Sequence, residues 1–135
     1  MSGTTGRAVR TAPVVDPGPD PRPQLSVDSA TPKIIGWVCT QCGHPLALSA
    51  PWCPICRGEL TDALWGPGGQ VWSSTVLRVP LPGRTPPMVL VYVDLDDGPR
   101  VLGHVDAADV QRLHAGTRVS LTGASSEGDL LFVSE

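Results

Sequence analysis

The sequence has no long apolar segment. Hydrophobic residues make up 41% of its 135 residues, yet no run of about eighteen of them exists, so no membrane-spanning helix is expected. The first residues are polar and proline-rich, without the apolar core of a secretory signal. Both absences predict a cytoplasmic protein without a membrane partner. The length suffices for one ordinary domain, or for a small metal module plus a compact barrel.

A recognisable catalytic constellation is also missing. The sequence contains no Ser-His-Asp order, no glycine-rich phosphate loop and no paired His–carboxylate metal site. His104 and His114 have no evident partner group, so structural or solvent-facing roles are expected for both. Asp94, Asp96 and Asp97 crowd one turn, where solvation explains them better than a bound cation. The chain is therefore predicted not to be an enzyme.

Positive charge is scarce in the C-terminal part of the chain. Residues 1–58 carry five basic and three acidic side chains, which gives +2. Residues 59–135 carry five arginines and ten acids, which gives −5, and the two values sum to the net charge of −3. An acidic half is a poor electrostatic match for a phosphate backbone, so no nucleic-acid partner is expected.

All four cysteines lie in two C-x-x-C pairs, at Cys39, Cys42, Cys53 and Cys56. Each pair can place two thiolates on one metal from a single tight turn, so the two pairs complete a tetrahedral Cys₄ shell. This spacing in a protein expected in the reducing cytoplasm favours metal binding over disulfides. Zinc is predicted, with rubredoxin-type iron as the alternative, because tetrahedral S₄ sites accept either metal. His44 follows the first pair but is expected to lie outside a shell that closes at four ligands.

Composition divides the chain into three parts. Residues 1–32, rich in Pro, Gly, Thr, Ser and Asp, show no apolar periodicity and are expected to be a disordered tail. Residues 33–62 are predicted to form a zinc ribbon. Its few apolar side chains imply that metal binding supplies much of its folding free energy. Residues 63–135 are predicted to form a separate β domain.

Apolar patterns in this last part predict five strands, at residues 69–79, 88–95, 100–105, 117–123 and 128–133. The strand over 88–95 is apolar on both faces, which predicts a central position. In the first strand, Val71, Thr75, Leu77 and Val79 share one parity, which predicts a common face. Residues 80–87 are expected to form a rigid proline-rich loop.

The connections between these strands suggest the fold. Asp97-Gly98 predicts a hairpin turn in which the glycine supplies the positive φ. Residues 106–114 predict a short helix, with Asp106 as its N-cap and Gly116 as its stop. The resulting order β-β-β-α-β-β is typical of an OB-fold, a small five-stranded Greek-key barrel. An SH3-like or other small barrel is the alternative.

From about residue 37 to its end, the chain resembles the acyl-CoA-associated OB-fold proteins with a rubredoxin-like zinc ribbon, formerly a domain of unknown function. The segments that carry the resemblance are the two cysteine pairs with Gly43 and Pro54, Trp65–Val76, Val79–Gly83, Pro87–Arg100 and Ala115–Val119. Each motif is weak alone, but together and in this order they are fairly specific.

This resemblance implies a non-catalytic partner of thiolase-superfamily enzymes, which include thiolases, acyl-CoA aldolases of steroid side-chain breakdown and ketoacyl-type synthases. Members of the family help to form or seal the acyl-CoA site of a hetero-oligomer. Arg84, at the tip of the 80–87 loop, is our candidate for contacting acyl-CoA, because a guanidinium can pair with a CoA phosphate. Two alternatives stay open: a nucleic-acid-binding protein, since ribbons and OB-folds both serve that role, and an iron electron carrier.

Overall fold

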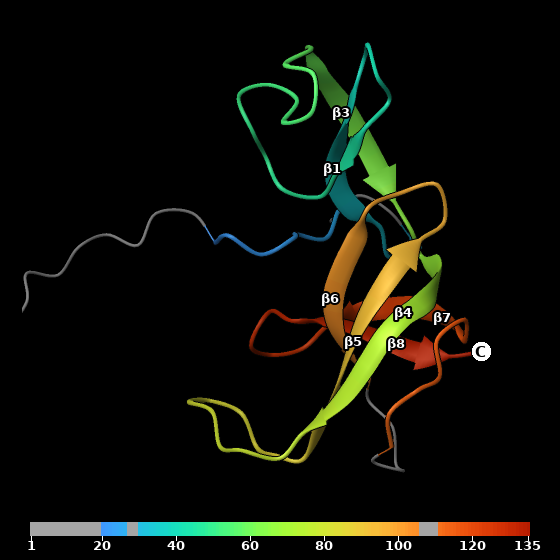
Figure 1. Cartoon of the computed structure of the whole chain (residues 1–135). Helices are drawn as coiled ribbons and strands as arrows, with labels where there is room; N and C mark the ends of the chain where they lie inside the picture. The colour runs from blue at the N-terminus through green and yellow to red at the C-terminus, as the bar shows by residue number, and fades with distance from the viewer. Residues whose placement is uncertain (1–19, 27–29, 106–110) are drawn as a thin grey trace, which may run out of the picture.

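The computed structural model describes residues 20–26, 30–105 and 111–135, which form eight strands arranged in a small sheet and a barrel (Figure 1). The strands are β1 (Ile34–Cys39), β2 (Pro45–Leu46), β3 (Leu60–Trp65), β4 (Gly68–Leu77), β5 (Met88–Leu95), β6 (Arg100–Val105), β7 (Arg118–Ala124) and β8 (Leu130–Ser134). In Figure 1 the small sheet stands at one end of the barrel, and the β4–β5 loop projects from the other end.

The small sheet has the order β2-β1-β3, with both neighbours antiparallel to β1. Strand β3 is not predicted from the sequence, because Leu60–Trp65 lacks a regular apolar alternation. All six of its residues pair with β1, from Ile34 opposite Trp65 to Cys39 opposite Leu60. The predicted boundary between the zinc ribbon and the β domain, at residues 62 and 63, therefore falls inside β3. The pairing of β3 with β1 extends the small sheet to Trp65.

Strands β4 to β8 close a barrel of order β4-β5-β6-β8-β7, sealed by pairing of β4 with β7. The only parallel contact in this order joins β6 to β8. Five strands with this order form an OB-fold, so the predicted fold class is confirmed. The strands predicted at 88–95 and 100–105 match β5 and β6 residue for residue.

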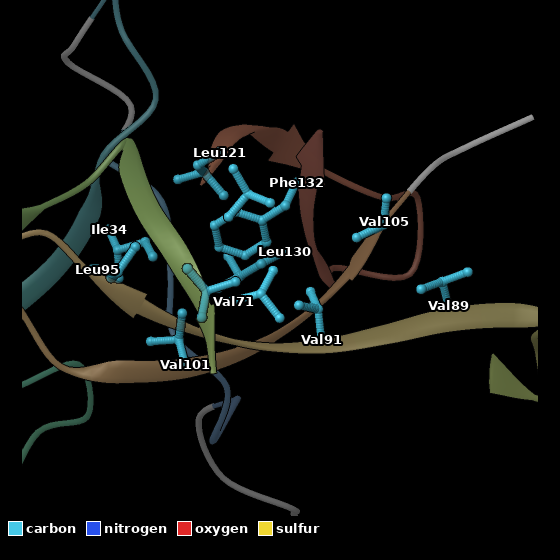
Figure 2. Close-up of a cluster of buried hydrophobic side chains, with 12 residues drawn as sticks. Ile34, Val71, Val89, Val91, Leu95, Val101, Val105, Leu121, Leu130 and Phe132 are labelled. Atoms are coloured by element: carbon cyan, nitrogen blue, oxygen red, sulfur yellow. The ribbon is translucent and has the colours of Figure 1, made fainter. Parts of the chain in front are cut away.

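The barrel interior is filled by aliphatic side chains around Phe132, which is only 1% exposed (Figure 2). The buried set consists of Ile34, Val71, Val89, Val91, Val93, Leu95, Val101, Val105, Val119, Leu121, Leu130 and Phe132. Branched aliphatic side chains suit inward positions on strands, where they pack against neighbouring strands. Ile34 is the one member of this core that comes from the small sheet.

A β-bulge in β4 changes the face predicted for this strand. The register against β5 shifts between Val71 and Ser73, so Trp72 is the extra residue. Val71 is buried, but beyond the bulge Val76 packs against the core, whereas Val79 is 57% exposed. The expected common face of Val71, Thr75, Leu77 and Val79 is therefore wrong, because one inserted residue reverses the alternation.

The β5–β6 turn also differs from its prediction. Asp97, not Gly98, adopts the left-handed conformation, with φ of 56°. Asp tolerates this region because its short side chain can bond to the local backbone. Gly98 is needed for packing instead, since a Cβ there would lie 3.0 Å from the Trp65 ring.

Two further expectations fall partly outside the described residues. The predicted helix over 106–114 includes residues 106–110, which are not described, and residues 111–114 have no regular secondary structure. Of the predicted disordered tail, residues 1–19 and 27–29 are not described. Residues 20–26 lie against the protein: Leu25 bridges to Ile34, and Ser26 N–H donates to the Lys33 carbonyl.

Within the described residues, no helix has the length and apolar character needed to cross a membrane.

Gly103 provides a test of the barrel packing. A Cβ at this buried position would lie 2.7 Å from two ring carbons of Phe132 and 3.0 Å from the Leu130 carbonyl oxygen. We expect Gly103→Ala to lower the free energy of unfolding by about 1–3 kcal/mol through overpacking, measured by urea denaturation. The control is Leu102→Ala, because Leu102 is 48% exposed and should change stability by no more than about 0.5 kcal/mol. Equal effects of both changes would contradict the packing described here.

Candidate metal centre

The four cysteine sulfurs form one compact cluster at the tip of the small sheet. All four Sγ atoms lie within 4.8 Å of one another, with 3.4 Å between Cys39 and Cys56 and 3.6 Å between Cys42 and Cys53. None of the four is in a disulfide. Sulfurs on a tetrahedral zinc are about 3.8 Å apart, given Zn–S distances of about 2.3 Å. The donor set and its spacing therefore fit one tetrahedral metal ion.

The two C-x-x-C turns have the same backbone pattern. In the first, Gly43 N–H donates to the Cys39 carbonyl (3.1 Å), and Cys39 N–H donates to the His44 carbonyl (3.0 Å). In the second, Arg57 N–H donates to the Cys53 carbonyl (2.8 Å), and Cys53 N–H donates to the Gly58 carbonyl (2.9 Å). In each turn one of these hydrogen bonds spans four residues and the other spans five. The two turns are structural copies that present paired sulfurs to a common point.

Backbone amides point at the sulfurs in both turns. Gln41 and Cys42 N–H groups lie 3.4 Å from Cys39 Sγ, and Ile55 N–H lies 3.4 Å from Cys53 Sγ. Such N–H donors stabilise negative charge on sulfur. His44 contributes through its backbone, whose N–H hydrogen-bonds Cys42. Its side chain is not part of the sulfur cluster.

Two residues of the second turn were not singled out from the sequence. Arg57 occupies the left-handed position, with φ of 65°, where the first turn has Gly43 at 78°. A Cβ on Gly58 would lie 2.8 Å from Cys39 Sγ and 3.1 Å from Cys56 Sγ. The glycine that follows Cys56 by two residues was the available sequence signal, because close packing against sulfur admits no side chain there.

The thiols differ in acidity because they share one small volume. The Cys42 N–H, helped by the Gln41 N–H, lowers the pKa of Cys39 to about 6 despite burial. For Cys42, the His44 N–H lowers the pKa, but burial and the thiols of Cys56 and Cys53 outweigh it and raise the value to about 12. One thiolate thus disfavours ionisation of its neighbours. A bound cation would remove this conflict by neutralising the shared charge, and its binding would release protons.

Trp65 joins the sulfur-bearing sheet to the barrel. Its indole Nε1 donates to the Leu46 carbonyl at 2.9 Å, and its ring lies beneath Gly98 of the β5–β6 turn. Gly36 has no room for a side chain, since a Cβ would overlap Trp65 and the Leu46 carbonyl. Lys33 Nζ adds a 2.6 Å hydrogen bond to the Gly66 carbonyl. These contacts fix the orientation of the sheet on the barrel.

Arg84, the candidate CoA ligand, is bound to Asp129. Its Nε and Nη2 donate to the two carboxylate oxygens at 2.8 and 2.9 Å. Arg22 Nη1 donates to the same carboxylate at 2.9 Å, and His104 Nε2 lies 3.4 Å from it. Arg84, followed by Arg22, holds the pKa of Asp129 below its usual range. The CoA role of Arg84 stays a prediction, and a phosphate would have to compete with Asp129 for the guanidinium.

The other candidate polar residues do not gather at one point in the described structure. Asp94 accepts hydrogen bonds from Arg100 at 2.6 and 3.2 Å, and Asp96 accepts two from Arg118 at 2.9 and 2.7 Å. These carboxylates are therefore partly neutralised by arginine rather than only solvated. His114 is exposed, and its carbonyl accepts the Thr117 N–H at 3.1 Å.

Comparisons with known proteins find several similarities. Residues 64–124 match the family model described as "ChsH2, C-terminal OB-fold domain". A DUF35 domain-containing scaffold protein of Methanothermobacter thermautotrophicus is 28% identical over 93 residues, which cover 66% of this chain and 70% of the relative. The solved structure "Ltp2-ChsH2(DUF35) aldolase" has a chain similar in fold, with a TM-score of 0.60 and 24% identity over 76% of this chain and 84% of that chain.

The fold and the sulfur cluster define the class: a four-cysteine ribbon followed by an OB-fold barrel. Within this class, the chain is similar to the OB-fold DUF35 proteins. The family resemblance drawn from the sequence is thereby confirmed.

The paired turns can be tested at their left-handed positions. We expect Gly43→Ala to lower the free energy of unfolding by about 1–2 kcal/mol, because a Cβ disfavours positive φ. No atom lies within 4 Å of the added Cβ, so the effect would come from the backbone conformation and not from a clash. Arg57→Gly, the matched change, should retain full metal content and lose no stability. Both are measured by thermal unfolding with metal analysis. Loss of metal from Arg57→Gly would show that the arginine side chain, not the turn, is required.

Proposed function

We propose that this protein is a non-catalytic accessory subunit of a thiolase-superfamily enzyme: a thiolase, an acyl-CoA aldolase or a ketoacyl-type synthase. It would help to form or stabilise the acyl-CoA site of that enzyme. The observation that carries the proposal is the match of the barrel to the C-terminal OB-fold domain of ChsH2, a protein named in a solved aldolase together with Ltp2. The relative named as a scaffold protein supports the same role.

The chemistry of the described residues supports a scaffold rather than an enzyme. His104 and Asp129 are the nearest approach to an acid–base pair, at 3.4 Å. Both oxygens of Asp129 already accept hydrogen bonds from arginines, so this carboxylate balances charge and links chain segments. General acid–base catalysis would need a group positioned on a reacting proton.

We assign zinc to the four-cysteine cluster, held by Cys39, Cys42, Cys53 and Cys56. Structural zinc sites are closed tetrahedral shells, and two C-x-x-C turns supply four ligands. When bound, the ion would hold the four thiolates in a closed shell with no open coordination position for chemistry. The two turns would then hold the ribbon in shape, and Trp65 would hold the ribbon on the barrel.

The metal assignment predicts one zinc ion per chain in a colourless protein purified from its host. Cys39→Ser and Cys56→Ser should each lose the metal and the ribbon fold, because one ligand is removed from a four-ligand shell. Metal content is measured by mass spectrometry and the fold by NMR. A red protein with stoichiometric iron would instead favour the electron-carrier alternative. Full zinc content in either variant would show that the ligand assignment is wrong.

The accessory role predicts a stable complex with a thiolase-superfamily enzyme of the same organism. The tagged chain should co-purify with that enzyme and raise its melting temperature or its turnover of acyl-CoA. Size-exclusion chromatography with light scattering gives the stoichiometry. A control mixes the chain with a single-stranded oligonucleotide at low ionic strength. Binding to the oligonucleotide, with no effect on any such enzyme, would contradict the proposal and favour the nucleic-acid alternative.

A further inference from the structure

The segment that precedes the small sheet crosses from the ribbon to the barrel. Residues 20–26 read Asp-Pro-Arg-Pro-Gln-Leu-Ser, with a proline after Asp20 and another after Arg22. A residue before proline is restricted to extended conformations, and proline itself has a fixed φ. The segment is therefore stiff and extended, which lowers the conformational entropy lost when it attaches to the protein. In Figure 1 it is the blue trace between the small sheet and the barrel.

One end of this segment is attached to strand β1. Leu25 forms an antiparallel bridge with Ile34 and packs against the barrel core. The Ile35 N–H donates to the Gln24 carbonyl at 2.8 Å. Strand β2 pairs with β1 only farther along, at two residues, so the segment covers a part of the β1 edge that β2 leaves open. This attachment combines backbone pairing with a side chain on the core.

The other end is attached to the barrel by one side chain, that of Arg22. Its Nη1 donates to Asp129 Oδ1 at 2.9 Å and to the Glu127 carbonyl at 2.6 Å. Its Nε and Nη2 donate to the Asp20 carboxylate at 3.0 and 2.7 Å, which holds the guanidinium in this orientation. Asp129 is only 12% exposed, so the pair is better shielded than a surface ion pair, which commonly contributes little. The Arg22 side chain is 38% exposed, so water can still reach this contact.

The attached segment separates two grooves. The first, of about 450 Å³, lies between the segment and the ribbon residues Ile35 and Leu48. The second, of about 220 Å³, lies between the segment and the barrel residues Leu102 and His104. Arg22 lines both grooves. The position of this segment therefore sets the width of both.

We propose that residues 20–26 are a hinged strap, with Leu25 at the hinge and the Arg22–Asp129 ion pair as the latch that closes it. Opening the latch would release residues 20–24 and join the two grooves into one space between ribbon and barrel. A ligand or chain segment too large for either groove would enter only after the latch opens. This device belongs to the free chain and does not depend on which enzyme the chain binds.

The two attachments differ in a way that favours opening at the latch. Leu25 is held by the core and by backbone pairing, whereas the latch is a single side chain in contact with water. Local opening occurs where few buried contacts are lost. When the strap opens, Arg84 still donates to both oxygens of Asp129, at 2.8 and 2.9 Å. The carboxylate therefore keeps one arginine partner in the open state, which avoids the cost of an unpaired buried charge.

The test measures the hydrogen exchange of single backbone amides by NMR in the full chain. The Ile35 amide reports on the strap, because its hydrogen bond goes to Gln24. The Thr40 amide, bonded to the Glu59 carbonyl, reports on the ribbon, and the Val71 amide, bonded to the Thr117 carbonyl, reports on the barrel.

Arg22→Ala removes the latch. Arg118→Ala is the matched control, because Arg118 forms a similar ion pair with Asp96 at 2.7 Å on the barrel. Asp129→Asn keeps the size of the side chain and removes its charge. Metal content and thermal unfolding show that each variant is folded.

We expect Arg22→Ala to speed exchange of the Ile35 amide by about tenfold or more, because loss of a charge-assisted hydrogen bond favours the open strap. The Thr40 and Val71 amides should stay within about twofold of the wild type, as should all three amides in Arg118→Ala. The effect of Arg22→Ala should be several-fold smaller in the Asp129→Asn background, because both changes act on one contact.

Three results would overturn the strap. Unchanged Ile35 exchange in folded Arg22→Ala would show that Leu25 and the backbone hold the segment without a latch. Equal effects of Arg22→Ala in the wild-type and Asp129→Asn backgrounds would remove Asp129 as the latch partner. Equally faster exchange at Thr40 and Val71 would show that Arg22 supports the whole fold and not a local opening.

Discussion

The contact of Trp65 with the β1–β2 hairpin and the β5–β6 turn is the constraint on which the rest of the structure depends. The ribbon has few apolar side chains of its own, and it contributes only Ile34 to the barrel core. One indole at the end of β3 hydrogen-bonds Leu46 on the ribbon and packs beneath Gly98 on the barrel. The indole ring fits only because Gly36 and Gly98 have no side chains. Ile34, Ala47 and the Lys33–Gly66 hydrogen bond add to the contact that this ring makes between the two parts.

This junction couples the metal centre to the barrel. Strand β1 carries Ile34 at one end and Cys39 at the other, so a single strand spans from the barrel core to the sulfur cluster. Metal binding would order the two turns, the turns would fix β1 and β3, and Trp65 at the end of β3 would stabilise the β5–β6 turn. The metal is thus assigned a structural role, and its effect would reach the barrel through packing rather than through chemistry.

Asp129 joins separate chain segments at the side of the barrel. Its carboxylate accepts hydrogen bonds from Arg22 and Arg84, which come from the N-terminal segment and the β4–β5 loop. Because Asp129 is largely buried and its charge is matched, removing either arginine would leave a poorly compensated carboxylate. The same pair explains why Arg84 is not simply a solvated loop residue. The Arg84–Asp129 ion pair links the β4–β5 loop to the β7–β8 loop. In OB-folds, these two loops flank the usual ligand-binding face.

The sequence by itself determined the features that depend on neighbouring residues. Two C-x-x-C pairs define the ligand set because a tight turn brings both sulfurs of a pair together whatever surrounds them. Apolar runs located β5 and β6, and the order of strands indicated the OB-fold. The tertiary structure decided the rest. The bulge at Trp72, the strand β3, the Trp65 junction and the Arg84–Asp129 pair each depend on a partner far along the chain. Long-range pairing selects among local conformations of similar energy, and no short segment contains the information for that choice.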